Sequence, residues 1–186
     1  MEWQTGNDFD SGSAFISEPG CYHMLVSSVK FPAQTNSGKE IPNGLFTVVL
    51  AAAASTVPSQ VGKQLTLTFF APSINHSDQG KFATKKVDRF LLATGLISED
   101  DKNVKKAIDP NKAQGHQIMV KLEKSKGKDD KERVDIAYAD IYHVDDPEVA
   151  EWPKNAEQLA KIHKSRRKTD AKPSEPASTD TGGLDL

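Results

Sequence analysis

Short strand-like segments, rather than long helical ones, set the limits on how this 186-residue chain can fold. The clearest is Gln64–Phe70, in which apolar residues alternate with residues that are mostly polar. Side chains of a strand point alternately to its two faces, so one face of this segment is predicted to be buried and the other exposed. The buried face would carry Leu65, Leu67 and Phe69, and the other face Thr66, Thr68 and Phe70.

Four further segments have the composition and length of strands, and one has helical spacing. The predicted strands cover residues 21–31, 45–50, 64–70, 116–122 and 133–144. In 81–94 apolar residues recur four positions apart, and Gly95 follows as a helix-ending residue. Five strands with one helix between the third and the fourth is the element order of an OB-fold. We therefore predict an all-β fold with one inserted helix, a five-stranded OB-like Greek-key barrel; another small barrel or a sandwich remains an alternative.

Composition divides the chain into four parts. Residues 1–18 are polar and acidic and are predicted to be a flexible arm, and 19–150 form the folded domain. Residues 151–168 are predicted to be a short basic helix or linker. Residues 169–186 consist largely of Pro, Ser, Thr, Gly and acidic residues, which cannot bury enough apolar surface to fold, and are predicted to be a disordered acidic tail.

Charge is segregated along the chain although the net charge is only −2. Residues 23–128 contain 15 Lys or Arg against 8 Asp or Glu, whereas 129–153 contain 2 against 9. Such blocks are typical of proteins that bind a polyanion and carry an acidic competitor segment. Surface charge that is only solvated and has no partner gives the same pattern. Charge alone therefore does not distinguish a protein that binds a polyanion from one that does not.

The sequence favours a reducing compartment and no membrane. Cys21 is the single cysteine, so no disulfide can form within the chain. No apolar run reaches the roughly 18 residues that span a bilayer, and the N-terminus lacks the pattern of a signal peptide. We therefore expect a cytoplasmic protein.

Enzyme chemistry has little support in the sequence. The five histidines are scattered without metal-ligand spacing, and no glycine-rich phosphate loop is present. We expect a protein that is not an enzyme and uses no cofactor or metal. One alternative remains, a small metal-dependent nuclease that uses Asp145 and Asp146.

Several segments together resemble a known family. They are Pro19–Tyr22, 37–49, Phe90–Gly95, Gly115–Val120 and Ile141–Asp146. In these segments, across about residues 15–150, the chain resembles phage-encoded single-stranded DNA-binding and replication-accessory proteins. The resemblance implies that the protein coats single strands during replication or recombination, in the host cytoplasm if it is phage-encoded. The tail departs from the strongly acidic, aromatic-ended bacterial form, yet its last residues are the predicted contact for replication or recombination proteins: Leu184, Asp185 and Leu186.

Sequence-tolerant binding of single strands requires cations along the phosphates and aromatic faces for the bases. The predicted cations lie in or beside loops that would flank the groove of an OB-fold: Lys30, Lys39, Lys63, Lys121, Lys124, Lys126 and Lys128. The predicted stacking residues are Phe31, Phe70 and Tyr142. Phe70 is the best of them because it lies on the threonine side of its strand.

Two other outcomes stay open. The exposed sheet face could dock a protein instead of DNA, with the acidic block 129–153 making the contact. The first strand could also act as an edge that pairs with a second subunit, which would make the protein a homo-oligomer.

Overall fold

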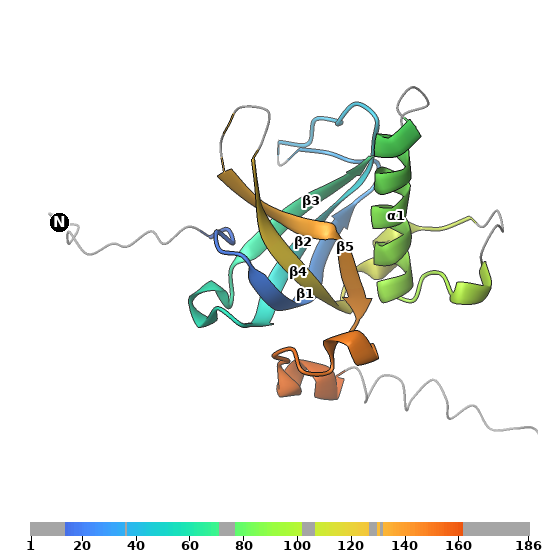
Figure 1. Ribbon diagram of the computed structural model, residues 1–186. Helices are drawn as coiled ribbons and strands as arrows, with labels where there is room; N and C mark the ends of the chain where they lie inside the picture. The colour runs from blue at the N-terminus through green and yellow to red at the C-terminus, as the bar shows by residue number, and fades with distance from the viewer. Residues whose placement is uncertain are drawn as a thin grey trace, which may run out of the picture. The chain divides into compact units, whose positions relative to one another are not determined.

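The computed structural model describes residues 14–35, 37–70, 77–101, 107–126, 130 and 132–161 (Figure 1). The chain divides into two compact units, Met1–Asn155 and Ala156–Leu186. Of the second unit, residues 156–161 are described, and they are helical. In the ranges given above, no helix combines the length and the apolar character needed to cross a membrane.

In its described residues, the first unit contains five strands and one long helix, in the predicted order. The strands are β1 (Gly20–Lys30), β2 (Gly44–Ser55), β3 (Gln64–Phe70), β4 (Gln117–Lys126) and β5 (Glu132–His143). Helix α1 (Ser77–Ala93) follows β3, and the 3-10 turns are η1 (Pro58–Gln60), η2 (Glu99–Asp101), η3 (Pro110–Ala113) and η4 (Pro147–Val149). The predicted order of strands and helix is confirmed, and β2 is longer than expected because the alanines after Leu50 continue the strand. β4 also extends beyond the predicted 116–122 to Lys126, so Lys124 and Lys126 lie on a strand and not in a loop.

The strands form one antiparallel sheet in the order β3-β2-β1-β4-β5. Consecutive strands β1, β2 and β3 form a meander, and β4 returns through α1 to lie on the free side of β1. This spatial order, 4-1-2-3, defines a Greek key. Figure 1 shows α1 standing beside the curled sheet.

The sheet does not close into a barrel, contrary to the prediction. β3 and β5 are its two edge strands, and no pairing joins them in the described residues. Helix α1 packs against both of these strands and supplies the apolar cover that strand closure would otherwise give. Register shifts between Met24 and its neighbour His23, and between Val120 and Leu122, curl the sheet without closing it.

The core lies between the inner sheet face and α1, and three aromatic rings form its centre. Phe46 of β2 stacks on Phe69 of β3 with ring centroids 4.7 Å apart. Phe90 of α1 lies 4.9 Å from Phe69 and 5.7 Å from Phe46. Aromatic pairs at these separations add to the stability that comes from burial alone. The three rings therefore fix the helix against β2 and β3.

Residues 14–18, which were expected to belong to the flexible arm, pack on the domain instead. The Ile16 amide donates to the Gln64 carbonyl at 2.9 Å, and the Gln64 amide donates to the Ala14 carbonyl at 2.8 Å. Ile16 is buried in the core. This short segment therefore pairs with the outer edge of β3 near its start.

Residues 144–155, here called the strap, follow β5 and lie on the outer face of the sheet. Val144 and Val149 are buried, and the ring of Trp152 meets that of Tyr142 edge-on with centroids 5.6 Å apart. At its end, the strap reaches β1 through Asn155, whose amide donates to His23. The strap thereby covers part of the outer face around β1, whereas Thr66 of β3 stays exposed on that face.

Truncation of Phe90, the aromatic ring that α1 contributes to the core, should lower the stability of the fold. We expect Phe90→Ala to lower the free energy of unfolding by about 3–5 kcal/mol, because it removes a fully buried ring and leaves a cavity between α1 and the sheet. Urea denaturation measures the loss. Phe70→Ala makes the same chemical change at an exposed site and should cost less than about 1 kcal/mol. Equal losses in the two variants would contradict the packing described.

Candidate functional site

The outer face of β2 and β3 is a neutral surface of small and polar side chains. The register places Thr47 opposite Thr68, Val49 opposite Thr66, and Ala51 opposite Gln64. The hydroxyls of Thr47 and Thr68 lie 3.2 Å apart, within hydrogen-bonding distance. Neither strand contains a charged residue. A ligand on this face, here called the floor, would therefore meet uncharged side chains, of which Thr66 is exposed and Thr47 is buried.

Two exposed aromatic side chains lie at one end of this floor. Phe70 ends β3 and is 46% exposed, and Phe31 follows the last residue of β1 and is 55% exposed. The antiparallel register brings the end of β1, the start of β2 at Gly44 and the end of β3 to the same end of the sheet. Both rings present flat apolar faces to solvent.

The loop from residue 31 to residue 43 is shaped by its own hydrogen bonds. The Ile41 amide donates to the Ala33 carbonyl at 2.9 Å, and the Thr35 amide donates to the Lys39 carbonyl at 2.8 Å. The Lys30 ammonium donates to the Thr35 carbonyl at 3.2 Å, and Lys39 is exposed. The loop thus holds two predicted cations at the same end of the sheet as Phe31.

Gly44 allows this loop to pack against the start of β2. A Cβ atom at this position would lie 2.6 Å from the Ala33 Cβ and 3.0 Å from the Ile41 carbonyl oxygen. Both distances are shorter than ordinary van der Waals contact. The close approach, rather than an unusual backbone angle, is what requires glycine here.

A third predicted cation lies at the opposite end of the floor. Lys63 immediately precedes β3 and is half-buried, and its carbonyl accepts a hydrogen bond from the Ala52 amide at 2.9 Å. Lys30 thus lies beside the floor, opposite Thr47 in the register of β1 and β2. Lys39 lies in the loop beyond one end, Lys63 lies beyond the other end, and the two strands carry no acid.

The lysines of the β4–β5 hairpin have acidic neighbours, which the sequence pattern did not indicate. Lys121 pairs with Glu123 at 3.0 Å, and Lys124 pairs with Glu132 at 3.4 Å. The hydrogen bond and charge of Glu123 raise the pKa of Lys121. Exposed pairs of this kind add little stability, but they reduce the positive field of the hairpin. Lys126 is exposed opposite Glu132 in the register, and Lys128 lies outside the described residues.

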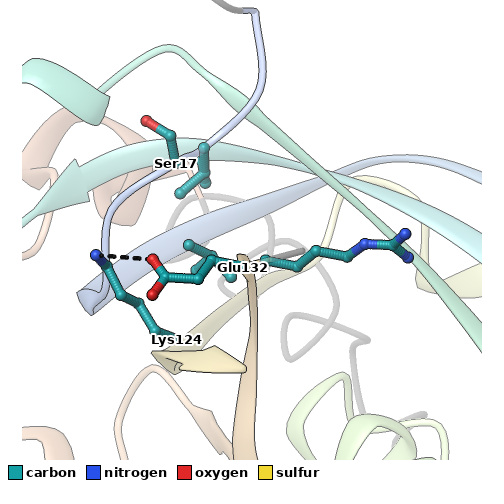
Figure 2. Close-up of a pocket in the computed structure, with 6 residues that line it drawn as sticks. Ser17, Lys124 and Glu132 are labelled. Atoms are coloured by element: carbon teal, nitrogen blue, oxygen red, sulfur yellow. Dashed lines mark hydrogen bonds and ion pairs between the residues drawn. The ribbon is translucent and has the colours of Figure 1, made fainter. Parts of the chain in front are cut away.

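A groove of about 380 Å³ lies between residues 16–17 and this hairpin. Figure 2 shows Ser17 on one side, and Lys124 with its partner Glu132 on the other. The other residues that line the groove are Ile16, Arg133 and Val134. Sequence reasoning missed this groove because residues 14–18 were assigned to a flexible arm. The signal that could have found it is the apolar pair Phe15-Ile16 within an otherwise polar segment.

Tyr142 is placed differently from the other predicted stacking residues. It lies on β5, where its hydroxyl donates to the Asp140 carboxylate at 3.2 Å and its ring contacts Trp152 of the strap. Burial, followed by the charge of Asp140, raises the pKa of Tyr142 to about 12. The structure thus engages this ring with the strap and does not bring it to the β2–β3 floor.

The acidic pair proposed for a nuclease has local structural partners. Asp146 caps η4 by accepting from the Glu148 amide at 2.9 Å. The Asp145 amide donates to His143 Nδ1 at 3.2 Å. Within the part of the chain that is described, no three His, Cys, Asp or Glu side chains are arranged to hold a metal ion. The predicted tail contacts, Leu184, Asp185 and Leu186, lie outside the described residues.

A scan against protein-family models and a search of the curated proteins both returned no match for this chain. The candidate site therefore depends on the geometry set out above.

The packing at Gly44 can be tested through the pair of positions that approach each other. Gly44→Ala should lower the free energy of unfolding by about 1–3 kcal/mol, because its Cβ overpacks against Ala33. Adding Ala33→Gly removes the opposing Cβ, so the double variant should recover part of that loss. Chemical denaturation of the two single variants and the double variant measures the coupling. Strictly additive losses would show that the two positions do not compete for space.

Proposed function

We propose that this protein is an OB-like, non-enzymatic protein that binds single-stranded DNA with little sequence preference. The Greek-key strand order supports an OB-like interpretation of the fold, because the OB-fold is a partly open Greek-key barrel. In that fold, nucleic acid lies on the face of the second and third strands, between the loops that follow the first and the fourth strands. The corresponding parts here are the β2–β3 floor, the 31–43 loop and the β4–β5 hairpin.

The observation that carries the proposal is the placing of Phe31 and Phe70 at one end of an acid-free floor. Aromatic faces stack on any base, since every base has a π-face, and lysines neutralise the phosphates between the bases. Lys30 and Lys39 lie at the end of the sheet where the two rings are, and Lys63 lies at the other end. A single strand laid along β2 and β3 would meet both kinds of group.

This arrangement favours single strands over duplex DNA. In a duplex the bases are already paired and stacked, so exposed phenylalanines gain little from them. The floor also lacks the arginine, asparagine and glutamine clusters that read base edges; Gln64 is the only one of these residue types on the two strands. Stacking and charge without base-edge contacts give binding that is largely independent of sequence.

The proposed activity also indicates the process, the compartment and the partners of the protein. A single-strand binder that resembles phage replication proteins would act during DNA replication or recombination, in a reducing cytoplasm suited to the lone Cys21. Its partners would be single-stranded DNA and replication or recombination proteins recruited through Leu184–Leu186. Neither a cofactor nor a metal is needed for this activity.

Binding should be salt-dependent and specific for single strands. We expect labelled oligo-dT to bind with a log–log salt slope of about −2, since three lysines flank the floor and each phosphate contact contributes about −0.7. Fluorescence anisotropy at several salt concentrations measures the slope, with duplex DNA and poly-U as competitors. Absence of oligo-dT binding at low salt would overturn the proposal and would favour a protein-docking role for the floor.

Removal of either exposed ring should weaken this binding without unfolding the protein. Phe70→Ala and Phe31→Ala are each expected to raise the Kd for oligo-dT about 5- to 150-fold, which corresponds to ~1–3 kcal/mol for the loss of one stacked base. Val61→Ala is the matched control, because Val61 is equally exposed at 47% but follows η1 at the other end of the strands. A control variant that lost as much affinity as the phenylalanine variants would show that the loss does not come from stacking on the two rings.

A further inference from the structure

His23 is a fully buried histidine whose two ring nitrogens both have partners. Its Nε2 lies 2.8 Å from Gln117 Oε1 on β4, and its Nδ1 accepts from the Asn155 amide at 3.0 Å. The second contact joins residues 132 positions apart in the sequence and connects β1 to the end of the strap. His23 therefore stands at the point where the strap is attached to the sheet.

The geometry determines which protonation state the histidine has. A backbone amide can only donate, so Nδ1 must carry a lone pair to accept from Asn155. Nε2 then carries the ring proton and donates to the Gln117 side-chain oxygen. A protonated imidazolium has a hydrogen on both nitrogens and cannot accept from the Asn155 amide. The contact between His23 and the strap thus exists only for the neutral ring.

Asn155 has a second attachment to the sheet. Its side-chain amide donates to the Ala53 carbonyl of β2 at 3.1 Å. His23 and Ala53 together hold the strap end across β1 and β2, beside the proposed binding floor.

The surroundings of His23 also disfavour its charged form. Burial is the main cause that lowers the pKa of His23, and the charge of Lys154 lowers it further, while the Gln117 hydrogen bond raises it. On the same face, β1 presents Cys21, β4 presents Lys121, and β5 presents Asp140, whose charge acts on Cys21 and Lys121; β2 presents alanines. No carboxylate in the described residues stabilises the charged form of His23 enough to restore its ordinary pKa.

We propose that His23 and Asn155 form a pH-sensitive latch, and that protonation of His23 releases the end of the strap from β1. The released state would expose His23, Met119 and the outer face of β1 next to the floor. The latch depends on the buried histidine and its partners, and it does not depend on whether the floor binds DNA.

The direction of the pH effect follows from the lowered pKa. Above the ordinary histidine pKa of about 6.5, the ring is neutral in both the latched and the released state, and the latch has its full stability. As the pH falls below this value, the released state takes up a proton first. The latch then weakens until the pH reaches the lowered pKa of the latched state. The opening transition must therefore have its midpoint below about 6.5.

Trp152 provides an internal signal for release: its ring contacts Tyr142 in the attached strap, and we expect this contact to be lost when the strap end is released. The experiment uses the full chain with Trp3→Phe, which leaves Trp152 as the one fluorescent tryptophan. Emission is recorded between pH 8 and pH 4.5 together with far-ultraviolet circular dichroism. We expect a red shift of the emission with a midpoint below about 6.5, while the dichroism remains unchanged. A constant emission, or a shift that coincides with loss of dichroism, would overturn the latch.

Two further measurements assign the effect to His23. His23→Gln keeps a side-chain oxygen that can accept from Asn155 but cannot be protonated in this range, so it should abolish the red shift; His163→Gln is the control and should retain it. If His23→Gln does not fold, amide hydrogen exchange of the Asn155 region in the unmodified chain replaces it. Once corrected for intrinsic exchange rates, protection there should fall on acidification while protection of β2 is retained. A pH-independent protection of the Asn155 region would equally overturn the latch.

Discussion

The fold depends on β1, which uses both of its edges. One edge pairs with β2 from Tyr22 to Lys30, and the other pairs with β4 from Gly20 to Leu25. Tyr22 takes part in both pairings and is fully buried, and its hydroxyl donates to the Glu18 carbonyl at 2.6 Å. Because β1 is central, the meander and the β4–β5 hairpin can only add on opposite sides of it. The Greek-key order is the direct consequence.

The outer face of the sheet has two halves, β1–β4 and β2–β3, which differ in how far they are covered. The strap covers the β1–β4 half, where His23, Gln117 and Met119 are buried although they lie on the outer side. The β2–β3 half keeps Thr66 and Phe70 exposed. One sheet face is thus divided into a closed part and an open part. The latch at Asn155 lies at the boundary between them, since this residue bonds to both β1 and β2.

Much of the fold could be predicted from local patterns, and the exceptions have one physical cause. The alternation of Gln64–Phe70 and the helical spacing before Gly95 are local signals, and they correctly predict β3 and α1. The open sheet, the pairing of residue 64 with residues 14 and 16, and the strap depend on contacts between residues distant in the sequence. No periodicity within one segment reports such contacts. The same limit applies to the site: exposure of Phe31 and Phe70 could be predicted, but the attachment of Tyr142 to Trp152 could not.

The weak overall charge of the chain does not argue against a polyanion as its ligand. What a strand on the floor encounters is the local field, and exposed charges further away than about 8–10 Å are largely screened at physiological salt. The acids of the β4–β5 hairpin are partly neutralised, because Glu123 and Glu132 each pair with a lysine. The floor itself carries no acid, Lys30 lies beside it opposite Thr47, and Lys39 and Lys63 lie beyond its two ends. In the folded domain, the segregation of charge along the sequence therefore becomes an uncharged outer face of β2 and β3 with lysines beside it and at both ends, while the acids of residues 129–153 lie on β5, its hairpin and the strap.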